Sequence, residues 1–139
     1  MFNLCWLAVA VMSLITYFKI FISRHQITAE DKYTHLVCMA TYKEPSELLV
    51  ATIESLANQT LVKNTVLAIG FEERTPDKDV KEDKIRHLFG SVFKKIIITA
   101  HPYGIEGEIP GKCSNNNFAL RESEKNLRSE GYDTDNILV

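Results

Sequence analysis

The sequence has no excess of basic residues. Its 139 residues include 16 Lys and Arg against 18 Asp and Glu, which gives a formal net charge of -2. A protein that binds a nucleic acid backbone needs surplus positive charge to displace the counterions of that backbone. The charge balance therefore argues against a nucleic acid as the partner.

Cysteines are few and their spacing matches no known framework. Cys5, Cys38 and Cys113 are odd in number, lie far apart and form no C-x-x-C motif. This pattern excludes a disulfide scaffold and a zinc site, and we interpret the three side chains as reduced thiols. The composition, 45% hydrophobic and 24% charged, is that of a globular chain. Its length allows one core and excludes a multidomain enzyme.

Charge is also missing from the beginning of the chain. Residues 1–18 carry no charged side chain, and the apolar run extends over about 22 residues, interrupted by Lys19. A helix of that length would cross a bilayer, so we expect a transmembrane anchor over residues 1–24. A cleaved signal peptide and a buried helix remain as alternatives, although no basic residue precedes the apolar run as a signal peptide requires.

The basic residues near this segment predict an orientation. Lys19, Arg24 and His25 follow most of the apolar run, and only the amino terminus precedes it. The positive-inside tendency then predicts a membrane protein with a single N-terminal anchor and its soluble domain, residues 33–139, on the cytoplasmic side. The lipid bilayer would be one of its partners.

The rest of the sequence alternates strand and helix patterns. Short apolar runs predict strands, and apolar residues at helical spacing predict helices between them. The expected strands cover residues 34–41, 66–69, 96–98 and 137–139; the expected helices run from about 45 to 59, through Ile85, Leu88, Phe89 and Val92, and from after Gly111 to near Gly131. This order is typical of an α/β fold with a parallel sheet.

Polar side chains follow three of these expected strands. In parallel α/β sheets, ligands bind beyond the carboxyl ends of the strands, so residues 41–44, 70–74 and 101–117 are the candidate site. The last residues, 137–139, form an apolar run with no turn or polar tail after it. We therefore expect the chain to be a fragment.

The segment His101–Asn117 contains the strongest chemical signal. It has three glycines, and Lys112 stands at the expected start of a helix. A lysine there is unfavourable unless an anion binds, because the helix N-terminus already carries partial positive charge. The alternative is a solvated lysine in a long loop. A Walker A motif is excluded, since Glu106 and Cys113 stand where it needs Gly and Ser or Thr.

Acids follow the first two strands. Glu44 could accept hydrogen bonds from a nucleotide or cap the next helix. Glu72 and Glu73 are adjacent, so at most one of them is expected to address the site, and pairing with Arg74 is the simpler alternative. For His101, a hydrogen bond that anchors the loop is favoured over catalysis.

Three segments together resemble the inverting, membrane-bound family 2 glycosyltransferases of GT-A fold, in the branch of polysaccharide synthases. They are A-T-Y-K-E-P at Ala40–Pro45, V-L-A-I-G-F-E-E-R at Val66–Arg74 and H-P-Y-G-I-E-G-E-I-P-G-K-C-S-N at His101–Asn115. The likeness runs from about Leu36 to Val139. It implies that the chain is the first half of a GT-A domain, Rossmann-like with a mainly parallel sheet, behind the anchor.

The resemblance also implies roles for particular residues. All of them would bind the nucleotide-diphosphate sugar, with Lys112 on the diphosphate and one of the two adjacent glutamates on uridine. They are Thr41, Tyr42, Glu44, Glu72, Glu73, Lys112 and Asn115. No catalytic residue is assigned within the chain.

The family's metal-binding D-x-D motif, its catalytic base and its acceptor site have no counterpart in these residues. The full-length enzyme would use Mg or Mn, with ligands absent from this chain. Asp133 and Asp135 do form an Asp-x-Asp sequence. They precede the last expected strand, however, so we interpret them as part of a turn.

The resemblance implies transfer of a sugar to a hydroxyl acceptor, carbohydrate or lipid, with inversion, and we expect the 139 residues alone to be inactive. A membrane-tethered nucleotide-binding module and a nucleotidyltransferase are the alternatives.

Overall fold

The computed structural model describes the backbone of residues 2–26 and 33–139, and the side chains of residues 6–21 and 33–139. The chain forms two compact units, Met1–Glu30 and Asp31–Val139.

The first unit contains one helix, α1 (Phe2–Gln26). Its sequence includes the polar residues Ser13, Thr16 and Lys19. No helix in the described part of the chain combines the length and the apolar character that a bilayer crossing needs. The predictions of a transmembrane anchor over residues 1–24 and of a membrane localisation are therefore wrong.

The prediction of orientation also used residues near the end of α1. The side chains of Arg24 and His25, like that of Cys5, lie outside the described side chains. With the anchor prediction overturned, a cytoplasmic placement of the second unit and a bilayer as its partner lose their basis.

The second unit is built on a parallel four-stranded sheet in the order β3-β2-β1-β4. The central pair is in register from His35 opposite Thr65 to Thr41 opposite Phe71, whereas β4 pairs only with Thr34 and His35. The strands are β1 (Thr34–Thr41), β2 (Thr65–Glu72), β3 (Lys95–His101) and β4 (Ile137–Leu138). The predicted α/β fold with a parallel sheet is confirmed.

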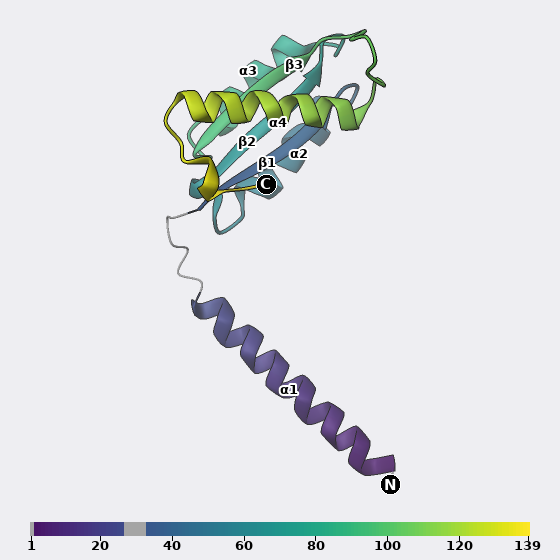
Figure 1. The fold of residues 1–139 in the computed structure, drawn as a ribbon, viewed down its shortest axis with the longest axis vertical. Coiled ribbons are helices and arrows are strands. Elements are labelled where there is room, and N and C mark those ends of the chain that lie inside the picture. The colour runs from purple at the N-terminus through teal and green to yellow at the C-terminus, as the bar shows by residue number, and fades with distance from the viewer. Residues whose placement is uncertain (1, 27–32) are drawn as a thin grey trace. The chain divides into compact units, whose positions relative to one another are not determined.

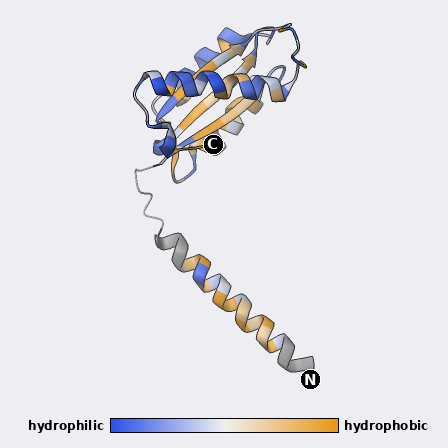
Figure 2. Cartoon of the chain, viewed as in Figure 1, coloured by the Kyte–Doolittle hydropathy of each residue, from blue (hydrophilic) through white to orange (hydrophobic). Residues whose placement is uncertain are grey.

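Helices cover both faces of the sheet (Figure 1). Alternate residues of β2 point to opposite faces, as the pleat requires: Leu67, Ile69 and Phe71 pack with α2 and α3, while Val66 and Ala68 pack with α4. The helices are α2 (Ser46–Ala57), α3 (Lys78–Phe89) and α4 (Lys112–Ser129), with 3-10 turns at Val62–Asn64 and Thr134–Asn136. Figure 2 shows the apolar strands between more polar helices.

Two details differ from the sequence pattern. On α3, Ile85 and Phe89 are buried as expected, but Leu88 is exposed and Val92 lies beyond the end of the helix. The pattern also ended the second strand near Gly70, whereas β2 continues to Glu72. The strand continues through Gly70, and the absence of a side chain there lets α4 lie close to β2.

Gly70 fixes the distance between β2 and α4. A Cβ atom at this position would lie 2.9 Å from the Cβ of Ala119 and 3.0 Å from the carbonyl oxygen of Asn115. Both neighbours belong to α4, and one is backbone that cannot rotate away. The close approach places the first turn of α4 beside the carboxyl end of β2.

We predict that Gly70→Ala lowers the free energy of unfolding by about 1–3 kcal/mol, because the added methyl overpacks the contact. Gly111→Ala is the matched control: its φ of 164° is extended backbone, and nothing lies within 4 Å of the added Cβ. The control should stay within about 0.5 kcal/mol of the parent. Urea unfolding followed by circular dichroism measures both, and equal midpoints for the two variants would contradict the prediction.

Candidate functional site

The candidate site lies at the carboxyl edge of the sheet. Parallel strands end at the same edge, so Thr41, Glu72 and His101, at the ends of β1, β2 and β3, come together there. Lys112 begins α4 at this edge as well. The structure thus brings together the three segments that the sequence singled out.

Glu44 makes contacts on both of its carboxylate oxygens. Oε2 accepts a hydrogen bond from the Thr41 hydroxyl at 3.0 Å and from the backbone N–H of Tyr42 at 2.6 Å. Oε1 forms an ion pair with the Lys112 ammonium at 2.8 Å. This carboxylate does not cap α2, whose N-cap is Pro45 without a side-chain hydrogen bond. Glu44 instead joins the end of β1 to the start of α4.

These contacts lower the pKa of Glu44 to about 2. The hydrogen bond from Lys112 is the largest cause, followed by the one from the Tyr42 backbone. Both favour the ionised form over the neutral one. The carboxylate is therefore charged throughout the physiological range and can only accept hydrogen bonds.

Glu72 and Glu73 have different surroundings, which separates the two candidates. Glu72 is 7% exposed and lines a hollow at the carboxyl edge. Glu73 is exposed, and its Oε2 accepts a hydrogen bond from the backbone N–H of Tyr103 at 3.0 Å. The structure therefore places Glu72 toward the site and uses Glu73 to hold the loop after β3.

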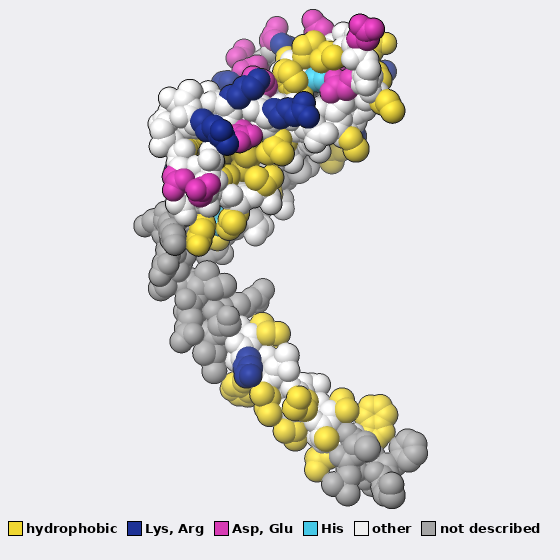
Figure 3. Space-filling view, viewed as in Figure 1, with side chains coloured by type: hydrophobic (Ala, Val, Ile, Leu, Met, Phe, Trp, Pro, Cys, Tyr) yellow, Lys and Arg dark blue, Asp and Glu magenta, His cyan; other side chains and the backbone are white. Residues whose placement is uncertain are grey.

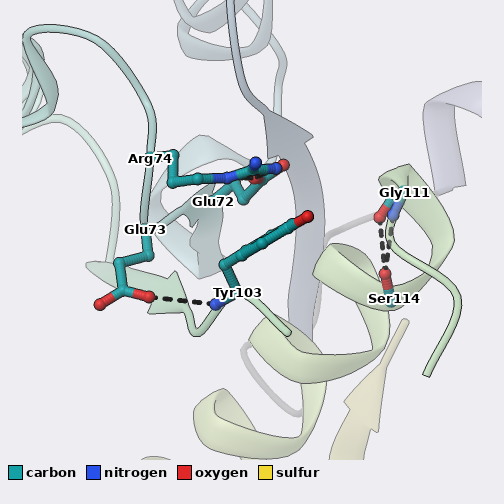
Figure 4. A network of polar contacts seen from close by, with 6 residues as sticks. All are labelled: Glu72, Glu73, Arg74, Tyr103, Gly111 and Ser114. Carbon is teal, nitrogen blue, oxygen red and sulfur yellow. Dashed lines mark hydrogen bonds and ion pairs between the residues drawn. The ribbon is translucent and has the colours of Figure 1, made fainter. Parts of the chain in front are cut away.

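Arg74 and Tyr103 form a stack that the sequence pattern did not identify (Figure 4). The guanidinium carbon lies 3.3 Å from the centroid of the Tyr103 ring and 5.9 Å from that of Tyr42. Nε of Arg74 donates to Oε1 of Glu72 at 2.7 Å, and its Nη2 contacts the same oxygen. The Glu72 carboxylate raises the pKa of Arg74 further. In the sequence, the feature that could have indicated this arrangement is the position of Arg74 two residues after Glu72, the acid at the end of β2.

The start of α4 has an open N-terminus. Gly111 carries no capping side chain; instead the Ser114 hydroxyl donates to the Gly111 carbonyl at 2.8 Å and accepts from its N–H at 3.1 Å (Figure 4). The first N–H groups of the helix therefore stay available to a ligand. The Lys112 side chain beside them is 72% exposed. Exposed N–H groups, the helix dipole and an ammonium group together favour an anion.

Asn115 lies one turn into α4 and is 3% exposed. It lines the same hollow as Glu72, together with Tyr103, Glu108 and Gly111. An amide at this position can donate and accept hydrogen bonds to a ligand or water in the hollow.

The two aspartates near the end of the chain lie in a turn. Oδ1 of Asp133 accepts a hydrogen bond from the backbone N–H of Asp135 at 3.1 Å, at the start of the 3-10 turn before β4. That turn precedes β4, at the opposite end of the strand from the candidate site. Within residues 6–21 and 33–139, no three His, Cys, Asp or Glu side chains are grouped as metal ligands.

Outside the site, charged side chains on α4 pair with one another. Lys125 contacts Glu122 at 2.6 Å and Arg128 contacts Glu124 at 2.7 Å, each about one helical turn apart. Figure 3 shows the two signs of charge intermixed on the visible face of the second unit. These pairs have the character of an ordinary solvated helix surface.

Comparisons with protein families, with curated proteins and with solved structures found no match. What the site can bind must therefore follow from its own residues. These offer an ammonium and free N–H groups at the start of α4, a stacked arginine and tyrosine, and a buried amide.

The lowered pKa of Glu44 predicts a pH dependence of stability. A folded-state pKa below the unfolded value stabilises the fold above the unfolded pKa, and the effect is lost as pH falls from about 5 to below about 2. We expect Glu44→Gln to cost about 1 kcal/mol at pH 7, since Lys112 is solvent-exposed, and clearly less near pH 2. Urea midpoints at a series of pH values measure the difference.

The control for this prediction is Glu54→Gln, which removes an exposed carboxylate from α2. It should leave the midpoints unchanged at every pH. A constant gap between the parent and Glu44→Gln from pH 7 to pH 2 would show that Glu44 acts through packing and not through its charge.

Proposed function

We propose that the second unit binds the nucleotide-diphosphate sugar of an inverting family 2 glycosyltransferase. The observation that carries this proposal is the position of Lys112. Its exposed ammonium lies at the open N-terminus of α4, at the sheet edge where β1, β2 and β3 also present polar side chains. The three segments at this edge are the ones that resemble the family.

Diphosphate binding would be an exchange of partners at Lys112. In the structure the ammonium contacts Glu44, so a bound diphosphate replaces or shares that carboxylate. An exposed ion pair contributes little to stability, and opening it costs little. The free N–H groups at the start of α4 then donate to the phosphate oxygens that Lys112 neutralises.

The nucleoside would extend toward the strand ends. Glu72 and Asn115 line the hollow, and the aromatic rings of Tyr42 and Tyr103 both lie near Arg74. Flat bases stack on such faces, and the arginine is already anchored by Glu72. Thr41 would act through Glu44, because its hydroxyl donates to that carboxylate.

The proposed reaction is a direct displacement at the anomeric carbon of the donor sugar. The acceptor hydroxyl loses its proton to a base and attacks, and the bond to the diphosphate breaks with its electron pair leaving on oxygen. Lys112 stabilises the negative charge on the leaving group. We assign no described residue as the base. The resemblance also implies Mg or Mn, for which the described residues supply no ligand set, and no step is assigned to the metal.

We predict that Lys112→Ala weakens binding of uridine diphosphate at least tenfold and changes uridine binding less than twofold, because only the diphosphate contacts the ammonium. Lys125→Ala is the matched control, since that side chain lies on the same helix and is also 72% exposed. Calorimetry on the full chain measures all four combinations.

Three outcomes are informative. Equal losses of both ligands in Lys112→Ala would show that Lys112 is structural. Tighter binding of a nucleoside triphosphate than of the diphosphate and its sugar would favour a nucleotidyltransferase. A folded chain that binds none of these ligands would refute the proposed function.

A further inference from the structure

The segment between β3 and α4 leads directly to Lys112. Residues 102–111 are mostly exposed, and Gly104 and Gly107 have φ angles of +80° and +79°, which suit glycine. A loop with so few buried side chains has little packing to hold it in one arrangement. Its end nevertheless has to enter α4 at a defined place if Lys112 is to meet a ligand.

The His101 side chain contacts both this loop and helix α4. It is 5% exposed, and its Nε2 lies 2.8 Å from Oε2 of Glu108. A carboxylate only accepts hydrogen bonds, so Nε2 carries the hydrogen and donates it. The other contact of the ring is with Phe118 of α4, at 4.8 Å between centroids. One imidazole thus joins the end of β3, the loop and the body of α4.

Backbone contacts hold the beginning of the loop independently. The N–H of Glu73 donates to the carbonyl of His101 at 2.9 Å, and the Glu73 carboxylate accepts from the N–H of Tyr103. Toward the other end, Glu108 is the last loop residue with a side-chain hydrogen bond before Gly111 in the described chain. The bond from His101 to Glu108 therefore fastens the chain just before the turn in which Gly111 and Ser114 bond to each other at the start of α4.

We propose that His101 is a positioning residue for the diphosphate. By holding Glu108 it fixes the chain three residues before Gly111, and so places the free N–H groups and Lys112 where an anion binds. This inference rests on the proposed function for its ligand. Burial alone would make His101 a stability residue, with no preference for one ligand over another.

A double-mutant cycle with Lys112 separates the two roles. In the full chain, His101→Ala should weaken uridine diphosphate roughly fivefold or more and leave uridine within about twofold. In the Lys112→Ala background the same change should have almost no further effect. His101→Gln, which keeps a donor near the Nε2 position, should restore most of the affinity. His87→Ala, an exposed histidine on α3, is the control.

Glu108→Ala breaks the same bond from the loop side and leaves the buried ring in place, so it serves if His101→Ala fails to fold. It should reproduce the selective loss of diphosphate affinity. Equal losses for uridine and its diphosphate, or the same loss with and without Lys112, would overturn the inference while leaving the proposed function intact.

A second measurement needs no ligand. Glu108→Ala should speed amide hydrogen exchange at residues 115–118 and leave α3 unchanged, because the N–H groups of these residues bond to the carbonyls of the first turn of α4, beginning with Asn115 to Gly111. If the folded parent bound no diphosphate, the proposed function would fail by itself. Unchanged exchange at residues 115–118 would refute the positioning role of His101.

Discussion

The close contact between β2 and α4 at Gly70 is the constraint on which the rest of the second unit depends. The backbone of Asn115 and the methyl of Ala119 lie where a side chain at residue 70 would be. Since α4 is antiparallel to the strands, this contact sets how far its first turn stands from their carboxyl ends. The positions of Asn115 beside Glu72 and of Lys112 beside Glu44 follow from it.

The sequence predicted most of this framework because burial and periodicity determine it. β1 was predicted with its observed bounds, since Thr34–Thr41 is a short apolar run between polar segments. The second strand was predicted to end at Gly70, because a glycine in a short apolar run often marks the end of a strand. The glycine is instead required by the close approach of α4, a helix that the local sequence does not reveal. The anchor prediction rested on the apolar run alone and is wrong, because no helix in the described part of the chain has the length and apolar character that a bilayer crossing needs.

The candidate site was less predictable than the fold. Topology brought residues 41–44, 70–74 and 101–117 to one edge, as parallel strands must. Side-chain pairing is different, because it depends on rotamers and on loop conformation. Which of the adjacent residues Glu72 and Glu73 faces the candidate site became clear only from the structure, in which Glu72 is the buried one. Arg74 was expected to neutralise an acid, yet its stack on Tyr103 depends on a loop almost thirty residues further along the chain.

The charges at the carboxyl edge show how an acid-rich site can accept an anion. Glu44, Glu72 and Glu108 are each held by a cationic or donor side chain, namely Lys112, Arg74 and His101. Of these three, Lys112 has the most exposed side chain, and its carboxylate partner has two further donors in Thr41 and Tyr42.

When Lys112 turns to a ligand, Glu44 therefore keeps two hydrogen bonds and does not become an unpaired charge. Arg74 and His101 have no such arrangement, since Glu72 and Glu108 depend on them more fully among the described contacts. Removing either partner would leave a carboxylate close to the place proposed for the diphosphate. The exchangeable cation is thus the one at the helix start, and the other two pairs keep the framework around it fixed.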